Sequence, residues 1–131
     1  AQARRSANRF LFESPLESLE LHTDIQRMQQ VIINLLSNAD KFTKNGTITL
    51  KVGLDEKKHV VLFSVSDTGC GIPLEKQKKV FERFEKLNEY AQGTGLGLAI
   101  CKLIVKKWGG KIWVDPHYTQ GARFLFTHPL D

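Results

Sequence analysis

A chain of 131 residues can form one domain with a single hydrophobic core, but it is too short for two. Its formal net charge of +5 comes largely from lysines placed between apolar positions of helix-like segments, which is typical of solvated helix faces, so we expect no nucleic-acid partner. Cys70 and Cys101 lack C-x-x-C spacing and the four histidines are scattered, which argues against a disulfide framework or a zinc site and favours a reducing, cytoplasmic location.

The sequence begins AQARRSAN and contains neither a signal-type segment nor an apolar run of membrane length. We therefore expect a soluble fragment of a longer protein. The sequence leaves open whether that protein is anchored in a membrane.

The first predicted helix follows two strand-like runs, residues 9–12 and 18–22. Thr23 and Gln26 form a capping box at its start, and Asp24 adds negative charge where the helix dipole favours it. Spacings of three and four predict one buried stripe, made of Ile25, Met28, Ile32, Leu35, Ala39 and Phe42. The Asn-Gly pair at 45–46 predicts a turn after the helix.

Alternation of apolar and polar residues predicts strands in the second half of the chain, with two shorter helical patterns between them. Helices and strands in this mixed order, with hairpin-length turns, predict an α+β fold in which helices cover one face of a mostly antiparallel sheet. The expected elements are strands at 47–54, 59–67, 111–114 and 123–127, a short helix at 75–84, and a longer helix at 96–108 closed by two glycines.

Three polar residues share one edge of the first helix. Asn34, Asn38 and Lys41 fall within about 60° of arc, beside the apolar stripe. An amide carbonyl is a suitable hard ligand for Mg²⁺, and lysine offers a point charge to phosphate. The same amides could instead cap neighbouring backbone groups.

A buried carboxylate is predicted at the end of the strand 59–67. Asp67 lies on the same strand face as three apolar residues, so it needs a hydrogen-bond donor, and the amine of adenine is a good candidate. Gly69 and Gly71 let the following backbone turn tightly and approach a flat ring, and Pro73 prevents an early helix. The alternative is an aspartate that only caps this loop.

The third motif is glycine-rich and leads into the helix 96–108. Gly93, Thr94, Gly95, Leu96 and Gly97 place backbone amides at a helix N-terminus, where an anion such as phosphate binds well. The spacing matches neither a dinucleotide fingerprint nor a P-loop. A flexible hinge is the alternative reading.

Four ordered motifs resemble the N box, first glycine box, F box and second glycine box of sensor histidine kinases: NLLSNADKFT at 34–43, DTGCGIP at 67–73, FERF at 81–84 and GTGLGL at 93–98. The resemblance spans about residues 24–126. It implies the Bergerat fold, a two-layer α/β sandwich with a mixed, mostly antiparallel sheet packed against about three helices. It also implies binding of ATP and Mg²⁺ and transfer of the γ-phosphate to a histidine.

By this resemblance, Asn38 ligates Mg²⁺, Asn34 supports the ion and the phosphates, and Lys41 contacts phosphate. Asp67 accepts from the adenine amine in a base pocket that the resemblance also assigns to Gly69, Gly71 and Ile72. The segment 93–97 (Gly93, Thr94, Gly95, Leu96 and Gly97) borders the triphosphate at the base of a lid.

The sequence also departs from this family pattern. The lid, 86–92, is short, and Arg83 and Lys86 are possible phosphate contacts, while Gly121-Ala122 stands where many relatives carry Gly-Thr or Gly-Ser. No histidine has the phosphoacceptor context: His22, His59, His117 and His128. The resemblance therefore implies a separate dimerisation and phosphoacceptor domain as partner, with residues 1–8 as a linker remnant, a homodimeric parent protein and, indirectly, a response regulator.

Two classes of alternative stay open: a hydrolytic or serine-kinase relative of this fold, and a non-catalytic nucleotide-sensing module. Hydrolytic relatives of this fold place a glutamate base where Asn34 stands, and an amide cannot take a proton, so we expect slow or absent ATP hydrolysis. A serine-kinase relative would form an acid-stable phosphoprotein. A nucleotide-sensing module would bind ATP without transferring phosphate.

Overall fold

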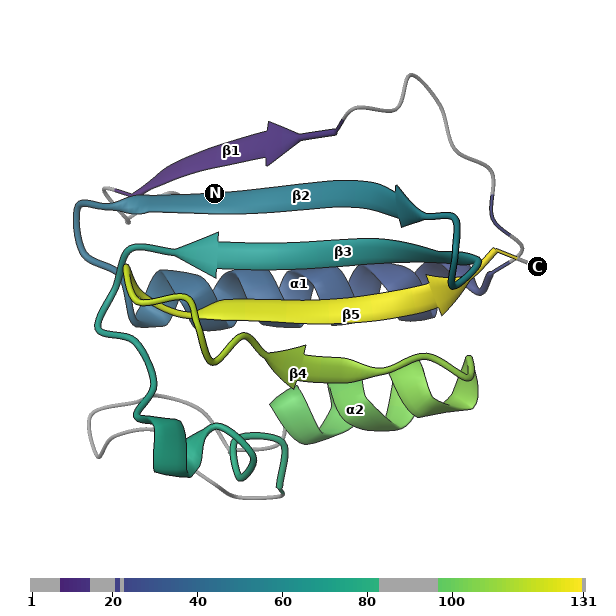
Figure 1. The fold of residues 1–131 in the computed structure, drawn as a ribbon. Coiled ribbons are helices and arrows are strands. Elements are labelled where there is room, and N and C mark those ends of the chain that lie inside the picture. The colour runs from purple at the N-terminus through teal and green to yellow at the C-terminus, as the bar shows by residue number, and fades with distance from the viewer. Residues whose placement is uncertain (1–7, 15–20, 22, 83–96, 131) are drawn as a thin grey trace.

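The computed structural model describes residues 8–14, 21, 23–82 and 97–130. Its elements form two layers, with both α-helices on the same face of one sheet (Figure 1). The helices are α1 (Ile25–Lys41) and α2 (Gly97–Lys107), with a single 3₁₀ turn, η1 (Leu74–Lys76), between them. The strands are β1 (Arg9–Glu13), β2 (Thr47–Asp55), β3 (Val60–Asp67), β4 (Ile112–Val114) and β5 (Arg123–Pro129).

The sheet has the order β1-β2-β3-β5-β4. Only β1 and β2 run parallel, and the other three pairings are antiparallel, which confirms the predicted mixed and mostly antiparallel sheet. The register pairs Ile48 with Asp67 and Val65 with Phe124, so the end of β3 lies beside the starts of β2 and β5. This arrangement brings residue 67 next to the chain around residue 122.

The hydrophobic core lies between the sheet and the two helices. Val31 and Leu35 of α1 and Val105 of α2 are fully buried, and the rings of Phe63 and Phe126 stack with their centroids 4.6 Å apart. The opposite face of the sheet is polar, as the alternation of β2 and β3 predicts, and carries a shallow hollow of about 460 Å³. Hydroxyl side chains line much of it: Thr47, Thr49, Ser64, Ser66 and Thr68.

The predicted start of α1 is wrong by one residue. Asp24 is the N-cap, because its Oδ1 accepts from the backbone N–H groups of Gln26 (3.0 Å) and Arg27 (3.3 Å). The hydroxyl of Thr23 lies 3.0 Å from Nε2 of His128 in β5 instead. Two adjacent residues could each cap the helix, and the contact with β5 decides between them.

The predicted apolar stripe of α1 also needs correction. Met28, Leu35 and Ala39 are buried as expected, but Ile25 is 64% exposed, and Val31, which the stripe omitted, is fully buried. Ile32 packs only at the edge of the core. Apolar residues occur around more than one side of this helix, so spacing alone does not select the side that meets the sheet.

The predicted helix 75–84 is wrong within the described residues. After Pro73 the chain makes i to i+3 backbone bonds, with η1 followed by turns, and the N–H of Glu82 donates to the carbonyl of Lys79 (3.0 Å). Val80 and Phe81 are buried, and the ring of Phe81 meets the edge of Phe124. So short a segment gains little from helix formation, and the burial of these two side chains determines its path.

Some predictions lie outside the described residues. These are residues 1–7, the strand 18–22 apart from Leu21, Arg83, the lid 86–92 and residues 93–96. His22 belongs to the same undescribed part, and Leu21 is described but is not in a strand. The boundary of the linker at residue 8 stays a prediction, and Asn8 itself is anchored to the fold, since its amide donates to Asp40 Oδ1 (2.8 Å) and to the carbonyl of Thr43 (2.7 Å). No helix among the described residues is long and apolar enough to span a membrane.

The two cysteines should differ sharply in reactivity. Cys70 is exposed, whereas Cys101 is buried between α2 and α1, and this burial raises the pKa of its thiol to about 11. Because the thiolate is the reactive form, we expect a thiol reagent at neutral pH to modify Cys70 alone in the folded protein, and both cysteines in denaturant. Mass spectrometry of the labelled chain measures this, and rapid labelling of Cys101 would contradict the packing of α2 on α1.

Candidate functional site

Asp67 is the centre of the candidate site. It is the last residue of β3 and is buried at 3% exposure on the same face as Val61, Phe63 and Val65, as predicted. Its Oδ1 accepts from the N–H of Gly69 (2.9 Å) and the N–H of Ala122 (3.0 Å). Its Oδ2 accepts no hydrogen bond from residues 8–14, 21, 23–82 or 97–130, so within this part of the chain one carboxylate oxygen is fixed and the other is available to a ligand.

The electrostatics of Asp67 also favour a donor at Oδ2. Burial raises the pKa of the Asp67 carboxyl above its ordinary value, and the hydrogen bonds from Gly69 and Ala122 act in the opposite direction. An N–H donor that reached Oδ2 would favour the charged form further. Through Oδ1 the carboxylate caps its own loop, as the alternative interpretation of the sequence predicts. Its Oδ2 can still accept a hydrogen bond from a ligand.

The loop after Asp67 depends on its glycines. A side chain at Gly69 would overlap the carbonyl of Phe42, and Gly71 has a φ of +75°, which is the tight turn that the sequence predicts. The N–H of Cys70 donates to the carbonyl of Phe42 at 3.2 Å, so the loop is tied to the end of α1. Ile72 is half-buried and packs against the core.

The polar edge of α1 lies on the side of the helix that faces α2. The amide Nδ2 of Asn34 donates to the carbonyl of Gly97 at 3.4 Å, and the Asn34 side chain also bonds the thiol of Cys101. Asn38 is half-buried, and its amide has no hydrogen-bond partner among the described residues. Lys41 is the exposed last residue of α1. Of the predicted site residues, this edge therefore brings Asn34 and Gly97 together.

Sequence reasoning missed three contributors. Thr43, inside the first motif, is buried, and its hydroxyl has no partner in the part of the chain that the structure describes. Ala122 supplies one of the two N–H groups on Asp67, and Tyr118 donates its hydroxyl to the Asp67 carbonyl at 2.9 Å. The sequence marks Gly121-Ala122 only as a departure from the family pattern and gives no local signal for Tyr118, because the contacts of both with Asp67 follow from the pairing of β3 with β5.

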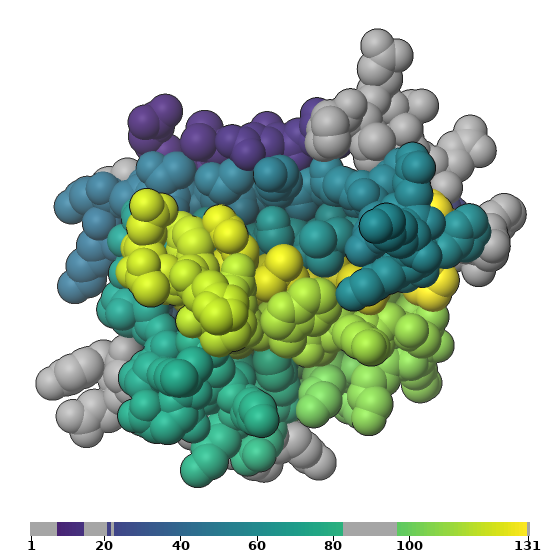
Figure 2. Space-filling model, in the orientation of Figure 1, coloured from purple at the N-terminus to yellow at the C-terminus, as the bar shows by residue number. Residues whose placement is uncertain are grey.

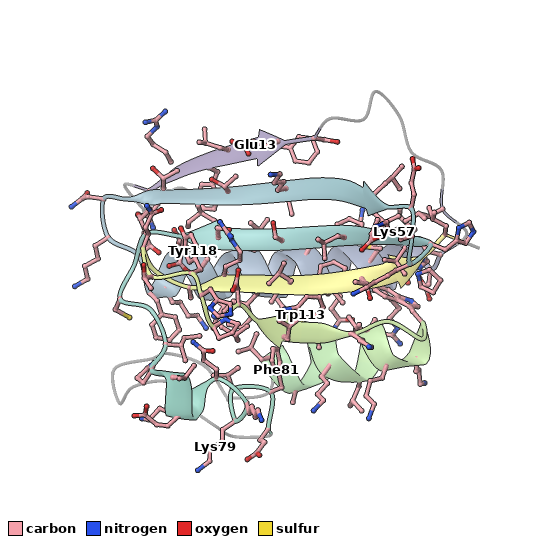
Figure 3. The ribbon with its side chains drawn as sticks, in the orientation of Figure 1. Glu13, Lys57, Lys79, Phe81, Trp113 and Tyr118 are labelled. Atoms are coloured by element: carbon pink, nitrogen blue, oxygen red, sulfur yellow. The ribbon has the colours of Figure 1, made fainter. Side chains whose placement is uncertain are left out.

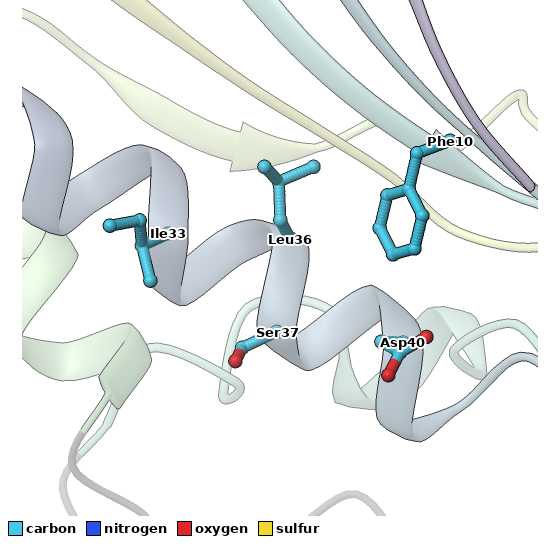
Figure 4. Close-up of a pocket in the computed structure, with 5 residues that line it drawn as sticks. All are labelled: Phe10, Ile33, Leu36, Ser37 and Asp40. Carbon is cyan, nitrogen blue, oxygen red and sulfur yellow. The ribbon is translucent and has the colours of Figure 1, made fainter. Parts of the chain in front are cut away.

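A second hollow on α1 differs in chemistry. It measures about 260 Å³ and lies between α1 and β1, where Phe10 faces the helix (Figure 4). Its lining from α1 is Ile33, Leu36, Ser37 and Asp40, about 120° around the helix from the edge that carries Asn34 and Asn38. It is therefore separate from the candidate site, where the described residues offer the Oδ2 of Asp67, the side-chain amide of Asn38 and the N-terminus of α2.

The sequence profile of one family matches residues 23–131, and its description is "Histidine kinase-, DNA gyrase B-, and HSP90-like ATPase". The adaptive-response sensory kinase SasA of Trichormus variabilis is 40% identical over 112 residues, which cover 84% of this chain and 28% of that protein. SasA of Gloeothece citriformis is 42% identical over 119 residues, covering 88% of this chain and 30% of that protein. The chain thus spans less than a third of the length of these relatives.

Solved structures agree with the sequence relatives. The nucleotide-free catalytic domain of histidine kinase ThkA superposes with a TM-score of 0.83 at 37% identity, over 95% of this chain and 80% of that chain. Full-length ShkA in complex with AMPPNP gives a TM-score of 0.82 at 31% identity, over 93% of this chain and 25% of that chain. The fold is therefore that of a histidine kinase catalytic domain, and the chain belongs to the histidine kinase-, DNA gyrase B- and HSP90-like ATPase family.

Proposed function

We propose that this chain binds ATP and Mg²⁺ and transfers the γ-phosphate of ATP to a histidine on a separate phosphoacceptor domain. The observation that carries the proposal is Asp67, a buried carboxylate with Oδ1 held by two backbone N–H groups and Oδ2 left for a ligand. In a family of ATPases, a base that presents an exocyclic amine fits that acceptor.

The base would lie beside Asp67. Oδ2 would accept from the adenine amine, and Gly69 and Gly71 would keep side chains away from the ring. Ile72 would add an apolar contact, since it is half-buried at the edge of the core. The hydroxyl of Thr43, without a partner in the described part of the chain, lies next to Gly69, which supports a polar ligand or water at this end of the site.

The phosphates would lie between the edge of α1 and the start of α2. The side-chain amide of Asn38, which has no partner among the described residues, would offer its oxygen to Mg²⁺, and Asn34 and Lys41 would support the ion and the phosphates. The N–H groups at the start of α2 would face the anion. The segment that would border the triphosphate is the one the family resemblance implies: Gly93, Thr94, Gly95, Leu96 and Gly97. Bound Mg²⁺ would supply neutralisation of the phosphate charge.

The chain needs no general base for this reaction. A neutral imidazole attacks through a lone pair, so positioning and charge neutralisation are the contributions expected from this side. The Asn34 amide donates to the carbonyl of Gly97 and cannot take a proton from water, which disfavours hydrolysis.

The partners follow from the same proposal. A dimerisation and phosphoacceptor domain would present the histidine, and a response regulator would receive the phosphate afterwards. The structure of histidine kinase ThkA in complex with response regulator TrrA superposes with a TM-score of 0.78 at 33% identity, over 95% of this chain and 34% of that chain, and it supports a response regulator as a partner. We propose a homodimer for the parent protein.

The test is phosphoryl transfer from γ-labelled ATP with Mg²⁺, using this chain together with a histidine-containing phosphoacceptor domain, in one protein or mixed in trans. We expect an acid-labile, base-stable phosphoprotein. An acid-stable product would favour the serine-kinase alternative, release of free phosphate alone would favour hydrolysis, and tight binding without any transfer would favour nucleotide sensing.

Asn38→Ala should lower transfer about tenfold, because one oxygen ligand of an ion that keeps several waters is lost. The affinity gained on adding Mg²⁺ should shrink by a similar factor in a calorimetric titration. Ser37→Ala is the matched control, since Ser37 is the exposed neighbour on another side of α1. Equal magnesium dependence in Asn38→Ala and Ser37→Ala would remove Asn38 from the metal site.

A further inference from the structure

The segment between β4 and β5 contacts both the side chain and the main chain of Asp67. Tyr118 donates its hydroxyl to the main-chain carbonyl of Asp67 at 2.9 Å, across 51 positions of sequence. The backbones of Asp67 and Ala122 also bond directly, since the N–H of Asp67 donates to the carbonyl of Ala122 at 2.9 Å. Figure 3 places Tyr118 near the end of β3, and Figure 2 shows the yellow-green segment standing in front of the sheet.

The ring of Tyr118 is itself held in place. The guanidinium carbon of Arg123 lies 4.2 Å from the centroid of the ring. Nε of Arg123 donates to the Ser66 hydroxyl at 2.8 Å, and Nη1 of Arg123 pairs with Oδ2 of Asp115 at 3.5 Å. Burial raises the pKa of the Tyr118 phenol, so the hydroxyl is a proton donor at neutral pH. The donor therefore has a defined position and a defined charge state.

The hydrogen bond from Tyr118 affects the position of the Asp67 carboxylate through one peptide group. That peptide joins Asp67 to Thr68, and its N–H donates to the carbonyl of Thr47 at 3.1 Å while its carbonyl accepts from Tyr118. Both ends of the peptide plane are thus fixed, which sets the direction in which the chain leaves β3. The next N–H, that of Gly69, then meets Oδ1 at 2.9 Å.

We propose that Tyr118 is a positioning residue of the nucleotide site, whose hydroxyl orients the Asp67 carboxylate toward the base. The inference rests on the proposed function, because it needs Asp67 to accept from adenine. Tyr118 lies on the polar side of the sheet, and its hydroxyl donates to the main-chain carbonyl of Asp67, so its effect reaches the base through that residue. It should act on recognition of the base and leave the phosphate end unchanged.

Tyr118→Phe keeps the ring and its contact with Arg123 and removes only the hydroxyl. We expect the affinity for a non-hydrolysable ATP analogue to fall about tenfold, since one hydrogen bond that orients the acceptor is lost. The preference for the ATP analogue over the matching GTP analogue should fall by a similar factor, while the affinity gained on adding Mg²⁺ stays the same. Thr119→Ala, an exposed change in the same segment, should leave all three quantities unchanged.

Calorimetric titrations of the whole chain, with melting temperatures measured alongside, decide the point. The inference is overturned if Tyr118→Phe binds and discriminates like Thr119→Ala, or if it loses affinity for both analogues equally together with a lowered melting temperature, which would mark a structural role. Asp67→Asn separates the two proposals. If that variant binds ATP normally, the proposed function fails, whereas if it loses binding and Tyr118→Phe does not, only the role of Tyr118 fails.

Discussion

Asp67→Asn is expected to abolish ATP binding while the domain stays folded. The asparagine oxygen can still accept from Gly69 and Ala122, as Oδ1 does now, but an NH₂ group then replaces Oδ2 and meets the adenine amine donor to donor. A charge-assisted hydrogen bond is worth about 1.5–3 kcal/mol, and the facing donors add a further desolvation cost, so the affinity should fall at least about 100-fold. Calorimetric titration with a non-hydrolysable ATP analogue measures it.

The same variant should be at least as stable as wild type at neutral pH. Burial raises the folded-state pKa of Asp67 above its ordinary value of 3.8, so the folded protein holds this proton more tightly than the unfolded chain. The free energy of unfolding therefore falls as pH rises from about 3.8 through the folded-state pKa of Asp67. Above that pKa, the destabilisation caused by the buried charge is constant. Asparagine carries no such cost. Urea unfolding at pH 7 and near pH 3 measures the difference between variant and wild type.

Asp55→Asn is the matched control for both measurements. Asp55 makes the same kind of local bond, its Oδ1 accepting from the N–H of Lys58 at 3.2 Å, but it is the last residue of β2, paired with Val60 at the start of β3. That variant should bind ATP like wild type. If Asp67→Asn unfolds at neutral pH, or if it binds the analogue as well as Asp55→Asn does, the carboxylate is structural and the assignment of the base to Asp67 is wrong.

The sheet and the burial of Asp67 could be predicted from sequence because both depend on alternation over a long run. The strand 59–67 places Asp67 in phase with Val61, Phe63 and Val65, and the structure buries all four. The N-cap of α1 could not be predicted, because two neighbouring residues can cap the helix with similar free energies. Thr23 and Asp24 are both good caps, and the contact of Thr23 with His128, more than 100 residues away, decides which one caps α1.

The carboxylate could be predicted from sequence, but the groups that hold it could not. Gly69 is two residues from Asp67 and belongs to a recognisable motif, whereas Tyr118 and Ala122 reach it only through the β3–β5 register. A register set by core residues such as Val65 and Phe124 leaves no mark in the sequence around residue 118. A candidate ligand residue is therefore easier to predict than the residues that orient it.

Gly121→Ala should disrupt the site and the fold together. A Cβ at this position would overlap the main-chain carbonyl of Asp67 and lie 2.6 Å from its Oδ1, and neither can yield while Tyr118 and Ala122 hold them. Overpacking of this kind costs about 1–3 kcal/mol. Because the clash falls on the carboxylate that we propose to accept from the base, ATP binding should drop below detection. Urea unfolding and analogue titration measure the two effects.

Gly53→Ala gives the matched control, since Gly53 lies within β2 and a Cβ there would meet nothing within 4 Å. Alanine costs less backbone entropy than glycine in a strand, so this variant should gain up to about 1 kcal/mol of stability and bind ATP normally. The two variants add the same methyl group, one within β2 and the other two residues before β5, on either side of β3 in the sheet. If they lose equal stability, or if Gly121→Ala still binds the analogue, then the space around Asp67 is not what the nucleotide site requires.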